Sequence, residues 1–221
     1  MEKKLRVGLI RVLTTENEEL LNNHGKTLME KYPMLDVESR CIPDQYEGIH
    51  DVETEKKALP KIVELAKTYF ANKDMILISC ADDPGVELVR QALPGMVVTG
   101  GGETTVAVAL RYGEKIGLLG IMDYAPKAYR RMIPDKLVGV LRPEGVYSTL
   151  DLMTDAGRKS CLASAMQLKE MGAEVIALGC TGLATIGIAA EVEKATGLPV
   201  IDPVLAQGAF AAFEAAKRLG E

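Results

Sequence analysis

The sequence has few histidines and none of the close cysteine pairs that bind zinc. Its 221 residues include two histidines, His24 and His50, and four cysteines that form no Cys-x-x-Cys motif. Zinc sites usually combine close ligand pairs, so we expect no metal ion. A Ser-His-Asp or Cys-His hydrolase would have to use one of the two histidines, which narrows the possible mechanisms. Four cysteines in a chain this long also do not indicate a disulfide scaffold.

The sequence also lacks a long apolar run and an excess of positive charge. No stretch reaches the length of about 18 apolar residues that a membrane-spanning helix needs. The start of the chain is basic and then apolar, but its apolar part is too short for a signal peptide, so we expect a first strand there and a cytoplasmic protein. The formal net charge of -5 argues against broad binding to a phosphate backbone. We therefore expect neither a membrane nor a nucleic-acid partner.

Short apolar runs alternate with amphipathic helical stretches along the chain. This alternation is typical of βα units and a mainly parallel sheet. In the first half we expect strands at 5–10, 37–42, 75–79 and 96–99, and helices at 16–31, 53–71 and from Asp83 to about residue 93. Asp83 and Pro84 favour a helix start, because a carboxylate caps free N–H groups and proline suits the first helical position.

The same order of elements begins again in the second half. Segment 115–121 resembles 5–10, 155–171 resembles 53–71, 174–179 resembles 74–79, and 197–203 resembles 94–100. This internal repeat predicts two similar, pseudo-symmetric α/β lobes, each a mainly parallel sheet flanked by helices, with the active site in the cleft between them. We expect residues 1–103 plus 201–221 in the first lobe and 104–200 in the second. The helix at 204–218 would then pack back on the first lobe.

Cys80 and Cys180 follow matching strands of this repeat. Ligands of open α/β sheets bind at the carboxyl ends of the strands, where both thiols would lie. A thiol at the start of a helix has a lowered pKa, so one sulfur could act as a base and the other as an acid. The alternative is that each cysteine is a small core residue, which is the usual role of a free cysteine. We assign that role to Cys41 and Cys161, which we expect on a strand and on a helix face.

Small and polar residues near the strand ends are candidates for substrate contacts. Small residues let backbone N–H groups approach a carboxylate or an enolate oxygen, and hydroxyls can bind a carbonyl, although the same residues also cap helices and form turns. The glycine-rich segment 100–104 matches neither a dinucleotide-binding motif nor a P-loop, so we interpret it as a turn that lines a ligand. The candidates are Thr14, Thr15, Ala81, Asp82, Gly101, Glu103, Thr104, Asp123, Thr181 and Gly182.

Three segments resemble the Asp/Glu/hydantoin racemase family, most closely its hydantoin racemase branch. They are Ile78-Ser-Cys80-Ala-Asp-Asp-Pro-Gly85, Ala177-Leu-Gly-Cys180-Thr-Gly182 and Pro199-Val-Ile-Asp-Pro203. With the repeat, the resemblance covers nearly the whole chain. It implies a racemase without a cofactor, in which Cys80 and Cys180 move a proton at C5 of a 5-substituted hydantoin. It also implies a small-molecule substrate, a homo-oligomer, and an acidic residue of the branch at Glu103.

The chain also departs from this family. Members often carry Asn-Pro-Asn-Thr after the first strand, where this chain has Arg11-Val-Leu-Thr-Thr15, and the branch often has Phe-Gly-Asp-Pro where this chain has Ala81-Asp-Asp-Pro84. The alternatives therefore stay open: an Asp/Glu-type amino-acid racemase, an enzyme similar to maleate isomerase or arylmalonate decarboxylase, or a small-molecule-binding regulatory module. The decarboxylase type needs one of the two cysteines, so the presence of both counts against it.

Overall fold

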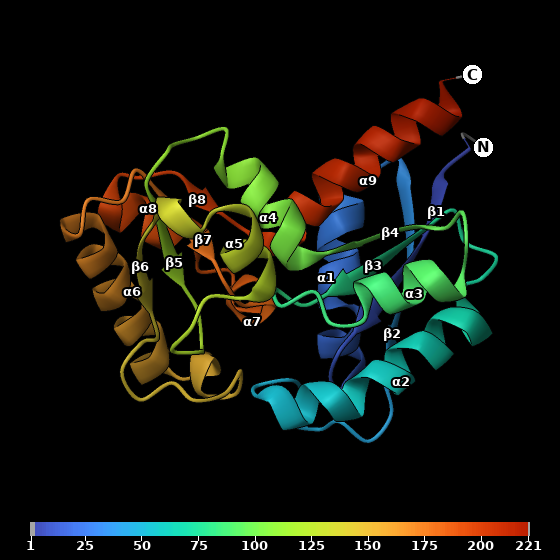
Figure 1. Ribbon diagram of the computed structural model, residues 1–221, viewed down its shortest axis with the longest axis horizontal. Helices are drawn as coiled ribbons and strands as arrows, with labels where there is room; N and C mark the ends of the chain where they lie inside the picture. Colours follow the sequence, from blue (N-terminus) through green and yellow to red (C-terminus); the bar gives the residue numbers. More distant parts are fainter. Residues whose placement is uncertain (1–2, 221) are drawn as a thin grey trace. The chain divides into compact units, whose positions relative to one another are not determined.

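The computed structural model describes residues 3–220 and divides into two α/β units. One unit holds the residues up to Gly101 together with those from Val204 onward, and the other holds Gly102–Pro203. Each contains a four-stranded parallel sheet, with strand order β2-β1-β3-β4 in unit 1 and β6-β5-β7-β8 in unit 2 (Figure 1). The predicted fold class is confirmed. The expected lobe boundaries at 103/104 and 200/201 stay a prediction.

The strands and helices of unit 1 follow the predicted pattern closely. They are β1 (Leu5–Arg11), α1 (Glu18–Lys31), β2 (Leu35–Cys41), α2 (Val52–Tyr69), β3 (Met75–Ser79), α3 (Val86–Ala92), β4 (Val97–Gly100) and the late helix α9 (Pro203–Leu219). Helix α2 begins at a capping box, in which the Asp51 carboxylate accepts a hydrogen bond from the N–H of Thr54 at 2.7 Å. Such a box supplies partners to N–H groups that the first turn leaves free.

Unit 2 contains more short elements than the sequence predicts. They are α4 (Gly101–Ala109), β5 (Ile116–Leu119), α5 (Lys127–Met132), η1 (Pro134–Lys136), β6 (Leu137–Leu141), η2 (Asp151–Met153), α6 (Asp155–Glu170), β7 (Val175–Leu178), α7 (Thr181–Thr185), α8 (Ala189–Thr196) and β8 (Val200–Ile201). Strand β6 and the helices α5 and α8 were not predicted. The sequence of β6, Leu-Val-Gly-Val-Leu, is itself a short apolar run, so this strand could have been predicted from the sequence.

The sheet of unit 1 is covered on both faces. Ile62 of α2 and Val89 of α3 pack with Ile78 in one core cluster. Because side chains alternate along a strand, Ser79 points to the opposite face, where it contacts His24 of α1 at 2.8 Å. Helix α9 covers that face as well, since Gln207 Nε2 donates to the carbonyl oxygen of Ile78 at 3.0 Å (Figure 1).

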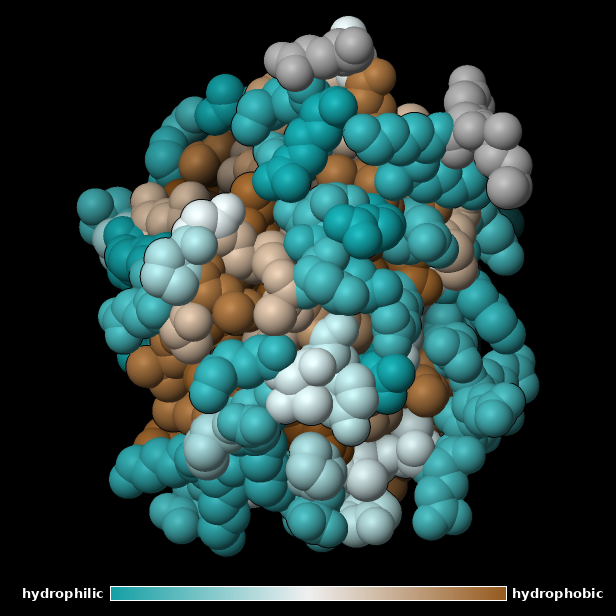
Figure 2. All heavy atoms as spheres, turned by 90° about the vertical axis from the view of Figure 1, so that its right-hand side faces the viewer, coloured by the Kyte–Doolittle hydropathy of each residue, from teal (hydrophilic) through white to brown (hydrophobic). Residues whose placement is uncertain are grey.

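The outer surface of the molecule is predominantly polar on the side that faces right in Figure 1. Figure 2 shows hydrophilic residues over most of that side, with smaller apolar areas between them. Within residues 3–220, no helix combines the length and the apolar character that crossing a bilayer requires.

Gly8 leaves room for the ring of Phe70, which provides a test of the packing between β1 and α2. A Cβ atom at Gly8 would overlap three ring atoms of Phe70, a side chain with 0% exposure. We predict that Gly8→Ala lowers the free energy of unfolding by about 1–3 kcal/mol, as overpacked cores do. The measurement is denaturant unfolding.

The control for this prediction is Phe70→Leu combined with Gly8→Ala. If the ring causes the clash, the double variant is more stable than the sum of the single effects by about 0.5–3 kcal/mol. Strict additivity would show that the ring and the added methyl group do not meet.

Candidate functional site

The predicted site residues of each unit gather at the carboxyl edge of its sheet. In unit 1, Thr14 and Thr15 follow β1, Cys80 follows β3, and Gly101 follows β4. In unit 2, Asp123 follows β5, and Cys180 follows β7, with Thr181 and Gly182 directly after it. Parallel pairing brings the carboxyl ends of neighbouring strands to one edge, which explains why residues distant in sequence meet there. Glu103 and Thr104 lie in the first turn of α4.

Cys80 lies in a tight turn and not at the start of a helix. Its carbonyl oxygen accepts hydrogen bonds from the N–H of Gly101 at 3.1 Å and from the N–H of Asp83 at 3.4 Å. Asp83 and Gly85 have φ angles of 54° and 71°. Both values lie in the left-handed region, which a right-handed helix does not contain, so α3 begins only at Val86. The expected helix start at Asp83 and Pro84 is therefore wrong.

The glycines after β4 pack directly against this turn. A Cβ atom at Gly100 would overlap the side chain of Asp83, and one at Gly101 would lie 3.0 Å from the carbonyl oxygen of Cys80. Ala81 and Asp82 are also buried in the turn, with 3% and 6% exposure. Segment 100–101 thus has to be glycine because the backbone after β4 approaches the Cys80 turn closely.

A buried pair supports the residue that precedes Cys80. His24 Nδ1 lies 2.8 Å from Ser79 Oγ, and both side chains are 1% exposed. This contact ties α1 to the last residue of β3. The sequence analysis missed it, since nothing in the spacing of His24 and Ser79 indicates that they meet. The pair holds the end of the strand from which Cys80 extends.

Cys180 caps helix α7 and lies in the core of unit 2. Its Sγ accepts a hydrogen bond from the N–H of Gly182 at 3.3 Å. The N–H groups of Gly182 and Leu183 lower the pKa of this thiol, but burial acts more strongly and raises its pKa to about 11. The expected lowering of the pKa is therefore wrong for Cys180, because the loss of water around a thiolate outweighs two backbone donors.

The two other cysteines have different surroundings. Cys161 of α6 is fully buried in the same core cluster as Cys180, and burial, followed by the nearby Cys180, raises its pKa to about 11. Cys41 is the half-buried last residue of β2, so it lies at the carboxyl edge of unit 1. Burial raises the pKa of Cys41, while the charge of Arg11 acts in the opposite direction.

Several of the remaining predicted residues already make contacts within their unit. Thr14 Oγ1 donates to the carbonyl oxygen of Ile42 at 2.6 Å, and Thr15 Oγ1 accepts from the N–H of Asn17 at 3.1 Å. In unit 2, Asp123 lies 3.1 Å from Arg142, and Glu103 lies 3.9 Å from Arg131. The Thr104 side chain is buried at 1% exposure. Their contacts with a substrate stay a prediction.

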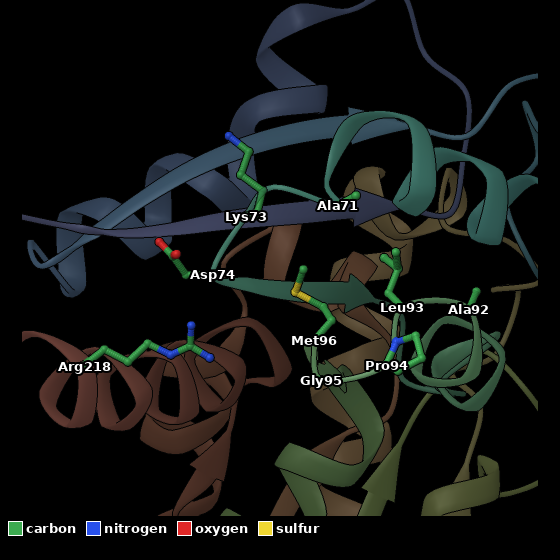
Figure 3. A pocket seen from close by; sticks show the side chains of 9 residues that line it. All are labelled: Ala71, Lys73, Asp74, Ala92, Leu93, Pro94, Gly95, Met96 and Arg218. Atoms are coloured by element: carbon green, nitrogen blue, oxygen red, sulfur yellow. The ribbon is translucent and has the colours of Figure 1, made fainter.

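A cavity of about 320 Å³ lies at the opposite edge of the first sheet, where β3 and β4 begin. Figure 3 shows the side chains that line it. Its charged residues are paired already: Lys73 with Glu38 at 2.7 Å, Asp74 with Arg6 at 2.9 Å and Arg218 with Glu214 at 2.6 Å. A second cavity, of about 640 Å³, lies between β2 and α2. Neither is lined by a predicted site residue, so neither adds to the candidate site.

Comparison with known proteins gives consistent results. The model of the family described as Asp/Glu/Hydantoin racemase matches residues 18–211. A hydantoin racemase of Rhizobium meliloti is 30% identical over 141 residues, which cover 60% of this chain and 56% of that protein. A hydantoin racemase of Paenarthrobacter aurescens is 25% identical over 144 residues, covering 59% and 57%. The matches thus span little more than half the length of these relatives.

Among solved structures, the allantoin racemase of Pseudomonas fluorescens has a similar fold. Its TM-score is 0.79 with 21% identity, and the match covers 98% of this chain and 92% of that one. At this level of identity the likeness shows the fold alone.

The raised pKa of Cys180 predicts slow alkylation that accelerates with pH. Only the thiolate reacts, so its iodoacetamide rate should rise about tenfold per pH unit between about pH 7.5 and 9.5 without levelling off. Peptide mapping by mass spectrometry separates Cys180 from the other thiols. The same peptide in unfolded protein is the control, where the rate should level off above about pH 9. A plateau near that pH in the folded protein would contradict the dominant effect of burial.

Proposed function

Because the chain belongs to the Asp/Glu/hydantoin racemase family, we propose that it is a racemase that works without a cofactor on 5-substituted hydantoins. The observation that carries the proposal is the equivalent position of Cys80 and Cys180. Strands β3 and β7 hold the same place in two sheets of the same order, and a thiol lies within two residues of the end of each. A pair at matched strand ends suits a reaction that needs two proton-transfer groups.

The reaction moves one proton and changes no other bond. One thiolate removes the hydrogen at C5, which is acidified by the neighbouring carbonyl, and becomes a thiol while an enolate forms. The second thiol then donates its proton to the opposite face of C5 and becomes a thiolate. The substrate keeps its composition and its configuration is inverted. The two sulfur atoms have exchanged protonation states, which exchange with water restores.

In this proposal Cys180 is the proton donor of the pair in the resting protein. Its pKa of about 11, raised by burial, supports this role, because the group is then a thiol at neutral pH. Cys80 then takes the proton in that direction of the reaction. When Cys180 has donated its proton, the N–H groups of Gly182 and Leu183 stabilise the thiolate that is left.

The polar and small residues of the two turns would bind the ring. In this proposal the backbone near Ala81, Asp82 and Gly101, together with Thr181 and Gly182, holds the substrate carbonyls and the enolate oxygen. Thr14, Thr15, Glu103, Thr104 and Asp123 complete the set of expected contacts. We also expect a homo-oligomer, as the family resemblance implies.

The competing reactions use the same fold with different demands on the thiols. Loss of carboxylate from a malonate derivative needs a single proton donor, so one thiol suffices. A binding module without turnover needs neither thiol. The presence of a thiol at both matched strand ends therefore favours the racemase.

The experiment that tests this function follows optical rotation of single enantiomers of 5-substituted hydantoins. We predict that wild type racemises them and that Cys80→Ser or Cys180→Ser lowers the rate at least about 100-fold, since serine is far less acidic than cysteine. Cys41→Ser is the matched control, because Cys41 also ends a strand at the carboxyl edge of unit 1 and should retain activity within a few-fold.

Racemisation that survives both serine substitutions would show that the two cysteines are core residues. Turnover that depends on only one of them would point to the one-thiol reaction. Binding of hydantoins without any racemisation would support the regulatory module.

A further inference from the structure

Arg11 carries a positive charge into the interior of unit 1. It is the last residue of β1, its neighbours in the sheet are Cys41 on β2 and Ser79 on β3, and it is 3% exposed. Because Ile10 faces the core cluster under α2 and α3, Arg11 points to the α1 face. Its guanidinium group therefore lies at the carboxyl edge of the sheet.

The guanidinium group is only partly bonded. Nη1 donates to the carbonyl oxygens of Leu20 and Leu21 at 2.7 and 3.3 Å, and no other hydrogen bond and no ion pair of Arg11 occurs among residues 3–220. Burial lowers its pKa to about 10, and the only group that opposes this effect is the thiol of Cys41. No carboxylate of the described chain compensates the charge.

Arg6, near the other end of the same strand, is an arginine of this sheet that is paired with a carboxylate, and it serves as a comparison for Arg11. Its Nε and Nη2 donate to the two carboxylate oxygens of Asp74 at 3.0 and 2.9 Å. This is the two-pronged contact that a planar guanidinium group makes with a carboxylate. Arg11 has Nε and Nη2 available for the same contact and lacks the anion. A buried charge without a counter-ion destabilises the folded protein. An arginine with a structural role alone would give no reason to retain such a charge.

Arg11 also lies beside the proposed reaction centre of unit 1. Its neighbour Ser79 directly precedes Cys80, so the strand that carries Arg11 adjoins the strand that carries the thiol. Arg11 itself lies outside residues 18–211, the range that the family model matches.

We propose that Arg11 binds a carboxylate of the substrate, so that this chain acts on a 5-substituted hydantoin with an acidic side chain. The inference rests on the proposed function, and it deepens that function by naming the substrate class. Nε and Nη2 hold the two carboxylate oxygens as Arg6 holds those of Asp74, and the hydantoin ring extends from there towards Cys80. A side chain without charge leaves the guanidinium group unpaired and binds more weakly.

The experiment compares an acid with its neutral isostere. Racemic 5-(carboxymethyl)hydantoin and racemic 5-(carbamoylmethyl)hydantoin are titrated into the protein by calorimetry. Racemisation cannot change the composition of a racemic ligand, so affinity is measured whether or not the protein turns it over. Wild type should bind the acid roughly 10- to 100-fold more tightly than the amide, which is the usual contribution of a hydrogen-bonded charge.

Three variants show whether this preference comes from Arg11. Arg11→Gln should remove the preference and raise the KM for the acid, with kcat nearly unchanged, because the carboxylate is not the reacting group. Arg11→Lys keeps the charge but cannot make the two-pronged contact, so it should retain only part of the preference. If Arg11→Gln fails to fold, this partial loss takes its place, and an undiminished preference in Arg11→Lys would contradict the proposal. Arg6→Gln, on the same strand, is the matched control and should keep the full preference.

Equal binding of acid and amide by wild type, or a preference that survives Arg11→Gln, would overturn the proposal. So would equal binding of sodium acetate and the acid, since Arg11 would then bind a free anion and not the substrate. Racemisation of either ligand, dependent on both cysteines, would leave the proposed function standing in each of these cases.

Discussion

Parallel strand pairing is the constraint on which the rest of this structure depends. In each sheet the central pair, β1 with β3 and β5 with β7, runs in the same direction, so both strands end at the same edge. After each strand the backbone must return through a helix to the start of the next parallel strand. The turns that lead from a strand into the following helix therefore all lie at one edge of the sheet. The thiols, the glycines after β4 and Arg11 are all found in or beside these turns. The order and direction of the strands therefore determine where these residues lie, and side-chain packing then determines their surroundings.

The two thiols are held in different ways at these equivalent positions. Cys80 lies in a turn shaped by left-handed residues and by the glycines after β4, with the His24–Ser79 pair fixing the strand before it. Cys180 caps a short helix and is almost entirely buried, and burial raises the pKa of its thiol to about 11. The proposed proton transfer would benefit from such asymmetry, because one member of the pair must start as an acid and the other as a base. The duplicated fold thus provides equivalent positions with unequal surroundings.

The sequence was sufficient for the fold because its signals are local or repeated. The apolar runs of β1 and β3 and the amphipathic pattern of α2 lie within short windows, and the second half repeats their order. The start of α3 was predicted wrongly, because the left-handed conformation of Asp83 depends on neighbours that a local window does not contain. The pKa of Cys180 was also predicted wrongly. The helix start is visible in the sequence, but the depth of burial is a property of the packed core.

The measurement that tests the central claim most directly is the position of deuterium during early racemisation in D2O. A single enantiomer of the substrate is partly converted, and the two enantiomers are then separated. The mass of each is measured by mass spectrometry and compared with that of substrate incubated in D2O without protein. If two thiols act on opposite faces of C5, the product carries one deuterium while the recovered substrate keeps its hydrogen. Deuterium in both enantiomers from the start would mean that one group both removes and returns the proton, and would contradict the paired roles of Cys80 and Cys180.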